Sequence, residues 1–156
     1  IDWPSWVPAE RAVLCFVRDR DALLLIQKKT GLGAGKVNAP GGRIEPGESA
    51  EAAAVREVRE EVCVEVSGLR DAGELFFQFA DGFSLHGTVF FASSHAGEPR
   101  ATREADPFWC PIGEVPWDRM WEDDRYWLPL ALEGRQFRAF FVFDGDRMLS
   151  RKIELR

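Results

Sequence analysis

The stretch from Gly42 to Val64, GRIEPGESAEAAAVREVREEVCV, decides the fold of this chain. It opens with glycine and a Pro-Gly pair, which break regular structure, and continues with an Ala- and Glu-rich run over Ser49–Val62. At about 100° per residue, Val55, Val58 and Val62 share one face of a helix. The stretch therefore predicts a glycine-bearing turn followed by an amphipathic helix whose valine face packs on the core.

A second face of the same helix carries acidic side chains. Glu57, Glu60 and Glu61 stand at i, i+3 and i+4, where like charges destabilise a helix by about 0.2–0.5 kcal/mol per pair. A hard divalent cation with oxygen ligands would offset this repulsion. The alternative is a solvated acidic face, which most Glu-rich helices carry.

The spacing of the fixed residues adds to this pattern. Gly42 is followed by five residues, Glu48, seven residues and the run Arg56–Glu61, REVREE. This spacing resembles the Nudix box, which continues with any residue, a glycine and an apolar residue. Cys63 stands in place of that glycine, and Val64 is apolar as in the motif. Because glycine ends a helix in the left-handed conformation without strain, Cys63 is expected to cost about 1 kcal/mol or to shift the cap.

The resemblance implies an α/β fold, the Nudix-type α/β/α sandwich with a mixed β-sheet between helices. It also implies Mg²⁺, with Mn²⁺ able to substitute, held by Glu57, Glu60 and Glu61. The backbone carbonyl at Gly42 would help to hold the metal. Arg56 would orient the carboxylates, and Glu60 or Glu61 would accept a proton from water.

Length and composition describe a globular chain of 156 residues, with 46% hydrophobic and 29% charged residues. We expect one Nudix domain over residues 1–156, with residues 1–10 as an irregular arm. The net charge of −6 argues against a protein that coats nucleic acid. No apolar run approaches the ~20 residues of a membrane span. The three cysteines show no CxxC spacing, which indicates reduced thiols in a cytoplasmic protein. We expect the protein to be a monomer.

Apolar runs between turn residues predict the remaining elements. Strands are predicted at Arg11–Val17, Ala22–Gln27, Gly73–Phe79, Phe83–Ala92, Phe108–Pro111, Phe137–Phe143 and Met148–Glu154. A second helix is predicted near Tyr126–Leu132, where Pro129 is tolerated only in the first turn. Residues 93–102 are expected to form a loop.

Two segments outside the box resemble one group within the Nudix family, the mammalian-type 8-oxo-dGTP diphosphatases. One segment is Lys28–Asn38, KKTGLGAGKVN, and the other is Met120–Leu130, MWEDDRYWLPL. The resemblance implies that Trp121 stacks on a purine base, that Asp123 and Asp124 bind the purine edge, and that Asn38 also contacts the base. Lys28 and Leu32 lie in the first segment, which either contacts a phosphate or base or is a plain loop.

The aspartate pair is chemically suited to this role. Two close carboxylates cannot both ionise cheaply, so the pKa of one rises and that group can donate a hydrogen bond. The alternative is that Asp123 or Asp124 caps the following helix while Trp121 fills the core. Several residues depart from the group and are expected to alter the pocket wall: Leu32 for phenylalanine, Val37 for tryptophan, Ala39-Pro40 for Gly-Phe and Ala105 for methionine.

The expected activity is Mg²⁺-dependent hydrolysis of oxidised purine nucleoside triphosphates, such as 8-oxo-dGTP, to the monophosphate and pyrophosphate. Such an enzyme sanitises the nucleotide pool and acts on free nucleotides, with neither a nucleic-acid polymer nor a membrane as partner. One alternative is a Nudix pyrophosphohydrolase for ADP-ribose, a dinucleoside polyphosphate or capped RNA, against which the Trp121–Asp124 segment argues. The other is a catalytically inactive nucleotide-binding module, against which the complete glutamate set argues. Glu104 is a further candidate acid, or a solvated loop residue.

Overall fold

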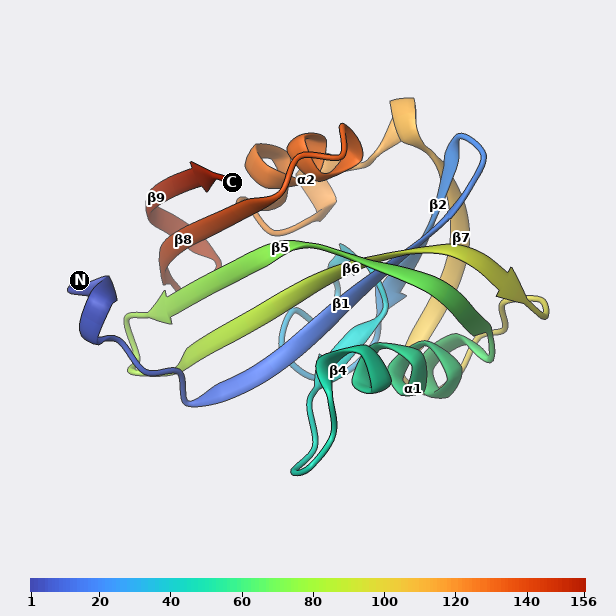
Figure 1. Ribbon diagram of the computed structural model, residues 1–156, viewed down its shortest axis with the longest axis horizontal. Coiled ribbons are helices and arrows are strands. Elements are labelled where there is room, and N and C mark those ends of the chain that lie inside the picture. The colour runs from blue at the N-terminus through green and yellow to red at the C-terminus, as the bar shows by residue number, and fades with distance from the viewer.

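A computed structural model describes residues 1–156 as a mixed sheet with two α-helices (Figure 1). The strands are β1 (Glu10–Asp19), β2 (Ala22–Lys28), β3 (Val37–Asn38), β4 (Gly41–Arg43), β5 (Glu65–Phe79), β6 (Ser84–Ala96), β7 (Ala105–Pro111), β8 (Phe137–Asp144) and β9 (Arg147–Leu155). The helices are α1 (Ala50–Val62) and α2 (Asp124–Leu132), with short 3-10 turns at Trp3–Ser5, Ile112–Glu114 and Trp117–Arg119. Neither α-helix has the length and apolar character needed to cross a membrane.

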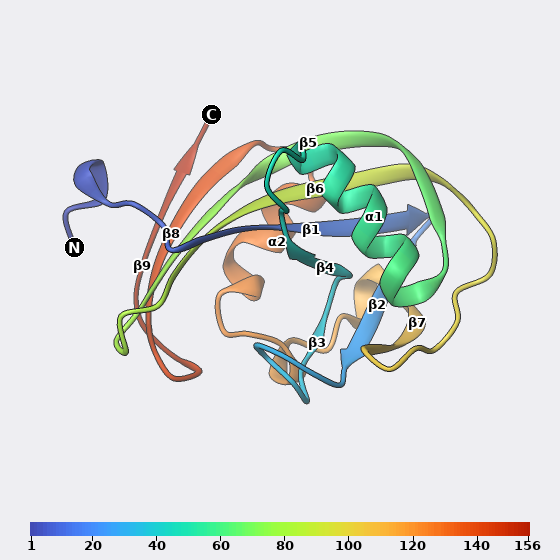
Figure 2. The same ribbon diagram turned by 90° about the horizontal axis from the view of Figure 1, so that it is seen from below.

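The sheet separates two hydrophobic layers. Its strand order is β3-β2-β1-β6-β5-β8-β9, with β4 paired to β1 and β7 paired to β2. β1 runs parallel to β6, and β5 parallel to β8, while the other pairs are antiparallel. Helix α1 packs on one face and α2 on the other (Figure 2). The prediction of a mixed sheet between helices is confirmed.

Helix α1 forms where the sequence predicts it. Ser49 is the N-cap, and its hydroxyl accepts the N–H of Ala52 at 3.1 Å. Val58 and Val62 are fully buried against the sheet. The helix ends at Cys63, whose φ of 63° and ψ of 30° are left-handed. The cysteine thus adopts the conformation that would be unstrained for the glycine of the motif.

Strands β5 and β6 are longer than predicted. β5 begins at Glu65, and β6 continues to Ala96, so residues 93–96 are strand and not loop. In the first half of β5 only Val66 and Ala72 are buried, because this part of the hairpin is largely exposed to solvent. A register shift between Asp71 and Gly73 interrupts the alternation further. The apolar pattern that signals a strand is therefore absent from residues 65–72.

Helix α2 begins earlier than predicted. It starts at Asp124, two residues before Tyr126, so Pro129 lies inside the helix and not in its first turn. The proline has no N–H for the carbonyl of Arg125 four residues before it. Because Arg125 is exposed, water can satisfy that carbonyl.

The N-terminal arm lies along aromatic residues of β5 and β8. The Trp3 ring is 5.2 Å from that of Phe140, and the Trp6 ring is 5.8 Å from that of Phe76, measured between centroids. The indole N–H of Trp6 donates to Gln78 Oε1 at 2.9 Å. These contacts fix the segment before β1 on the sheet.

Candidate functional site

Three carboxylates meet beside the N-terminal turn of the box. Glu57, Glu61 and Glu104 each place an oxygen within 4.8 Å of the others. Glu60 lies outside this trio; it is exposed, and its Oε2 is 3.2 Å from Nη1 of Arg56. The helical spacing therefore brings together two of the three glutamates predicted to bind the metal, and the third partner, Glu104, comes from the segment between β6 and β7.

Burial raises the pKa of two members of this trio. The pKa of Glu61 rises to about 8, because the desolvation of its carboxylate outweighs the N–H that Gly41 donates to Oε1 at 2.9 Å and the charge of Lys28. Burial also raises the pKa of Glu57. Carboxylate oxygens within reach of one ion are the ligands that Mg²⁺ and Mn²⁺ prefer, and a cation would compensate charge in this desolvated place. The donor set therefore fits the metal that the family resemblance implies.

The glycine at position 42 leaves room for one of these carboxylates. A Cβ on Gly42 would lie 2.5 Å from Cδ of Glu57 and 2.6 Å from both of its oxygens. A Cβ on Gly41 would lie 2.1 Å from the carbonyl oxygen of Val13 on the neighbouring strand. Both glycines are thus required by close packing.

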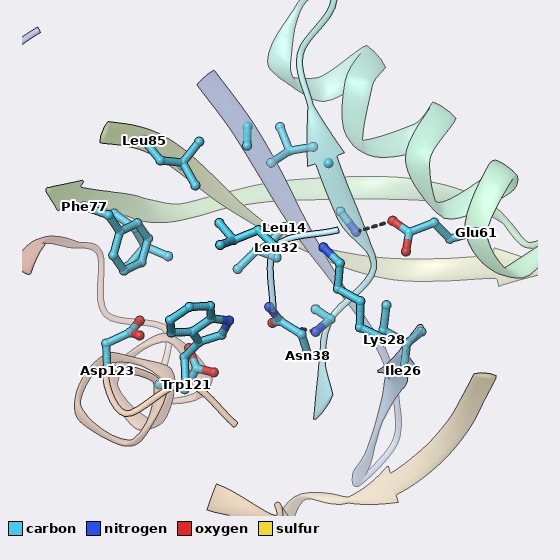
Figure 3. A pocket seen from close by; sticks show the side chains of 18 of the residues that line it. Leu14, Ile26, Lys28, Leu32, Asn38, Glu61, Phe77, Leu85, Trp121 and Asp123 are labelled. Carbon is cyan, nitrogen blue, oxygen red and sulfur yellow. Dashed lines mark hydrogen bonds between the residues drawn. The ribbon is translucent and has the colours of Figure 1, made fainter. Parts of the chain in front are cut away.

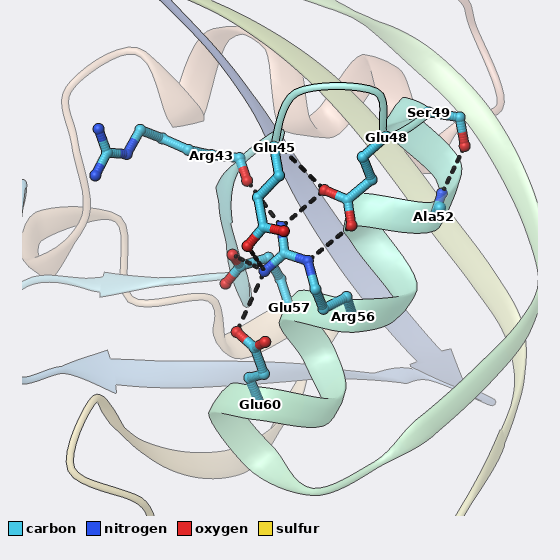
Figure 4. Close-up of polar contacts among 8 residues, drawn as sticks. All are labelled: Arg43, Glu45, Glu48, Ser49, Ala52, Arg56, Glu57 and Glu60. Atoms are coloured by element: carbon cyan, nitrogen blue, oxygen red, sulfur yellow. Dashed lines mark hydrogen bonds and ion pairs between the residues drawn. The ribbon is translucent and has the colours of Figure 1, made fainter.

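Arg56 joins the turn to the helix (Figure 4). Its Nε and Nη2 donate to the two oxygens of Glu48 at 2.7 and 2.9 Å, and Nη2 also donates to the carbonyl of Arg43 at 3.0 Å. Its Nη1 donates to Glu57 Oε1 at 2.8 Å. The paired guanidinium lowers the pKa of Glu48 to about 2. Arg56 therefore fixes the orientation of the Glu57 carboxylate.

A largely apolar pocket lies next to Glu61 (Figure 3). Its apolar wall includes Leu14, Ile26, Leu32, Leu75, Phe77, Phe79 and Leu85. Its polar lining includes Lys28, Asn38, Glu61, Asp123 and Asp124. Lys28 extends between Glu61 and Asn38, and the other end of the pocket is closed by Trp121 and Asp123 (Figure 3). One cavity thus connects the carboxylate cluster to the predicted base-binding residues.

The two aspartates of this pocket are almost completely buried, with exposed fractions of 1% for Asp123 and 3% for Asp124. Trp127 Nε1 donates to Asp123 Oδ2 at 2.8 Å. Asp123 Oδ1 and Asp124 Oδ2 have no hydrogen-bond partner. Asp123 occupies the N-cap position of α2 without a capping hydrogen bond. The helix-cap interpretation is therefore wrong for Asp123, whose carboxylate faces Trp127.

Burial raises the pKa of both aspartates. The pKa of Asp123 rises to about 6, held down in part by the hydrogen bond from Trp127. The pKa of Asp124 rises well above its usual value, through burial and the neighbouring charge of Asp123. The two carboxyls titrate as a pair, so near neutral pH one of them can hold a proton while the other is charged. The pair presents one donor and one acceptor side by side.

Contacts with neighbouring residues hold two other predicted pocket residues, Trp121 and Asn38, in place. Lys36 lies over the Trp121 ring at 5.2 Å from its centroid. A Cβ on Gly33 would lie 2.7 Å from Nε1 of Trp121, so the loop requires glycine to approach the indole. Asn38 Oδ1 accepts the N–H of Ala39 at 2.8 Å, which orients its amide and leaves the NH₂ group as a donor.

Comparison with known proteins settles the family. Residues 8–131 match the NUDIX domain. The chain belongs to the Nudix family.

This Nudix chain is 38% identical over 134 residues to an oxidized purine nucleoside triphosphate hydrolase of Danio rerio, a match that covers 85% of this chain and 86% of the relative. It is 36% identical over 139 residues to the protein of the same name in Mus musculus, covering 88% and 89%. A solved structure of a MutT protein from Bacillus halodurans has a TM-score of 0.83 and 28% identity, covering 93% of this chain and 97% of that one.

Four departures of this Nudix chain were expected to alter the pocket wall. Leu32, which is 47% exposed, and Ala39 do line the pocket. Val37 and Ala105 are fully buried and are not part of its lining. Val37 packs in the layer under α2 and Ala105 in the layer under α1. The expectation is therefore wrong for these two, whose small side chains are packed into the core.

Proposed function

We propose that this protein hydrolyses oxidised purine nucleoside triphosphates, such as 8-oxo-dGTP, to the monophosphate and pyrophosphate. One observation carries the proposal: a buried aspartate pair with an unpaired oxygen on each residue lines the pocket that also contains Glu61. The activity named for the Danio rerio and Mus musculus relatives supports it. Nucleotide-pool sanitation by a cytoplasmic monomer is the setting we propose, in keeping with three free cysteines.

The pocket suits a base that has both donors and acceptors along one edge. Protonated Asp124 would donate to that edge, and ionised Asp123 would accept from it. Trp121 would stack on the ring face. Asn38 would contact the base as well, while Lys28 and Leu32 would contact the nucleotide where the pocket meets the carboxylate cluster.

A divalent cation, Mg²⁺ or Mn²⁺, would be held by Glu57 and Glu61 together with Glu104, with Glu60 and the backbone of Gly42 nearby. When bound, it would neutralise charge on the phosphate oxygens and lower the pKa of water. Arg56 would hold the Glu57 carboxylate toward it. Glu60 or Glu61 would accept the proton of the attacking water.

Parallel kcat/KM measurements test this function. Purified protein with saturating Mg²⁺ is assayed on 8-oxo-dGTP, 2-hydroxy-dATP, O6-methyl-dGTP, dGTP and ADP-ribose, and the products are identified by ion-exchange chromatography. We expect a modified purine triphosphate to exceed dGTP, with monophosphate and pyrophosphate as products. A preference for ADP-ribose, or equal values for 8-oxo-dGTP and dGTP, would reject the proposal.

A further inference from the structure

Glu104 reaches the carboxylate cluster from an exposed segment outside the helices and strands. No helix or strand holds the Glu104 side chain in position, whereas Glu57 and Glu61 are held by α1. Its carboxylate nevertheless lies within 4.8 Å of the other two. The contacts that hold this segment therefore decide whether a third carboxylate is available to the cluster.

The segment is hydrogen-bonded to the C-terminal end of α1. The last carbonyls of a helix have no partner within the helix. Here the carbonyl of Val62 accepts the N–H of Arg100 at 2.9 Å, and the carbonyl of Glu61 accepts the hydroxyl of Thr102 at 2.7 Å. The free end of α1 thus provides the attachment point for the chain that carries Glu104.

The Thr102 hydroxyl makes a second contact in the opposite direction. Its oxygen accepts the N–H of Glu104 at 3.3 Å while its hydrogen goes to the carbonyl of Glu61. A single oxygen atom thereby links the backbones of two cluster residues. Thr102 is half-buried, so this link is partly shielded from competing water.

Lys29 supports the same turn from β2's side. Its Nζ donates to the carbonyl of Thr102 at 2.7 Å and pairs with Asp106 at 2.9 Å, and its N–H donates to the carbonyl of Glu104 at 2.9 Å. The N–H of Thr102 donates to the carbonyl of Ala105 at 2.9 Å, which closes the turn. Backbone and side-chain hydrogen bonds therefore hold the turn on two sides, and Thr102 provides its side-chain hydrogen bond to α1.

We propose that Thr102 is a positioning residue, whose hydroxyl fixes Glu104 against Glu61 and so completes the cation-binding cluster. The inference rests on the proposed function only in taking this cluster as a cation site. The proposal predicts that removal of the Thr102 hydroxyl lowers the affinity for the cation and that this loss depends on Glu104.

The test is direct Mn²⁺ binding without nucleotide, in which the electron paramagnetic resonance signal of free Mn²⁺ is measured. Thr102→Val keeps the side-chain shape and removes the hydroxyl, whereas Thr102→Ser keeps the hydroxyl. The other two variants are Glu104→Gln and the double variant Thr102→Val/Glu104→Gln. Thr30→Val, at an exposed loop position, is the matched control. Thermal unfolding of each variant reports whether the fold is retained.

We expect Thr102→Val to raise the Kd for Mn²⁺ by about fivefold or more, while Thr102→Ser and Thr30→Val stay within about twofold of wild type. In the Glu104→Gln background, Thr102→Val should add nothing, because both changes remove the same contribution. Saturating Mg²⁺ should restore the kcat of Thr102→Val with an unchanged nucleotide KM.

Three results would overturn the proposal: wild-type Mn²⁺ affinity in Thr102→Val, additive effects of the two changes, or a wild-type protein that binds no Mn²⁺. Failure of the proposed function looks different. In that case the Mn²⁺ results follow the pattern expected for Thr102, but oxidised nucleotides are not preferred as substrates.

Discussion

Replacing the buried aspartates one at a time separates the donor and acceptor roles that we assign to them. Trp127 Nε1 donates to Asp123 Oδ2 at 2.8 Å, which favours the charged form of Asp123. For Asp124, burial and the neighbouring charge of Asp123 raise the pKa and favour the protonated form. Asp124→Asn therefore retains a hydrogen-bond donor at its position, whereas Asp123→Asn replaces an acceptor with an amide that has only one oxygen to share between Trp127 and the base.

The magnitude follows from the two unpaired oxygens, Asp123 Oδ1 and Asp124 Oδ2. Leaving a buried polar group of the base without its partner costs about 1–3 kcal/mol. This range corresponds to about 5- to 150-fold in affinity. We expect Asp123→Asn to raise the KM for 8-oxo-dGTP toward the upper end and Asp124→Asn toward the lower end.

The assay is steady-state kinetics on 8-oxo-dGTP and dGTP at neutral pH and saturating Mg²⁺. The preference for 8-oxo-dGTP should shrink in both asparagine variants, because the two nucleotides differ only at the base, and kcat should change less than KM. Trp121→Ala is the comparison variant, and it should weaken both nucleotides by a similar factor because stacking tolerates changes at the base edge. Wild-type KM and selectivity in both folded asparagine variants would refute the reasoning and leave a Nudix hydrolase of unknown specificity.

Three further measurements have defined outcomes. Glu57→Gln or Glu61→Gln should lower kcat by at least about 10²-fold while the fold is retained, and wild-type turnover at saturating Mg²⁺ would remove that residue from the mechanism. Cys63→Gly should keep activity and raise the free energy of unfolding by about 1 kcal/mol, because φ is 63° at this position; an unchanged urea midpoint would contradict this. The folded-state pKa of Asp124 is raised above its usual value of about 3.9. Such a carboxyl stabilises the fold below about pH 3.9, and this stabilisation is lost as the pH rises toward the folded-state pKa. Asp124→Asn should therefore gain stability relative to wild type as the pH increases. Urea unfolding of both proteins at pH 5 and pH 8 measures this, and an equal difference at the two values would count against it.

The sequence predicted the turn and the box helix because each depends on residues close in the chain. It could not distinguish Glu60 from Glu61. Both lie on the acidic side of α1, and only packing against the sheet buries Glu61 and leaves Glu60 with Arg56. The position of Glu104 next to Glu61 could not be predicted from local sequence patterns. It depends on hydrogen bonds between the end of α1 and a segment far along the chain, such as the bond from Thr102 to Glu61 with its sequence separation of 41.

The first part of β5 and the start of α2 were missed for related reasons. Residues 65–72 form a strand by pairing with β6 and expose most of their side chains, so backbone pairing and not an apolar face defines them. In α2 the helix extends in front of Tyr126 because the buried Asp123–Asp124 pair and Trp127 fix its first turn. Proline statistics alone placed that turn too late.

The central position of β1 has a consequence for biosynthesis. β1 pairs with β2, which follows it directly, but its other long neighbour is β6, where Glu10 lies opposite Leu85 and Val17 opposite Ala92. Such non-local parallel pairing slows folding, since distant segments must meet before contacts form. A ribosome adding about 5–20 residues per second must therefore pass Ala92 before β1 gains this partner. An N-terminal fragment that ends after α1 contains the whole Nudix box but lacks Glu104 and the strands that complete the sheet under the helix, so it cannot form the carboxylate cluster on its own.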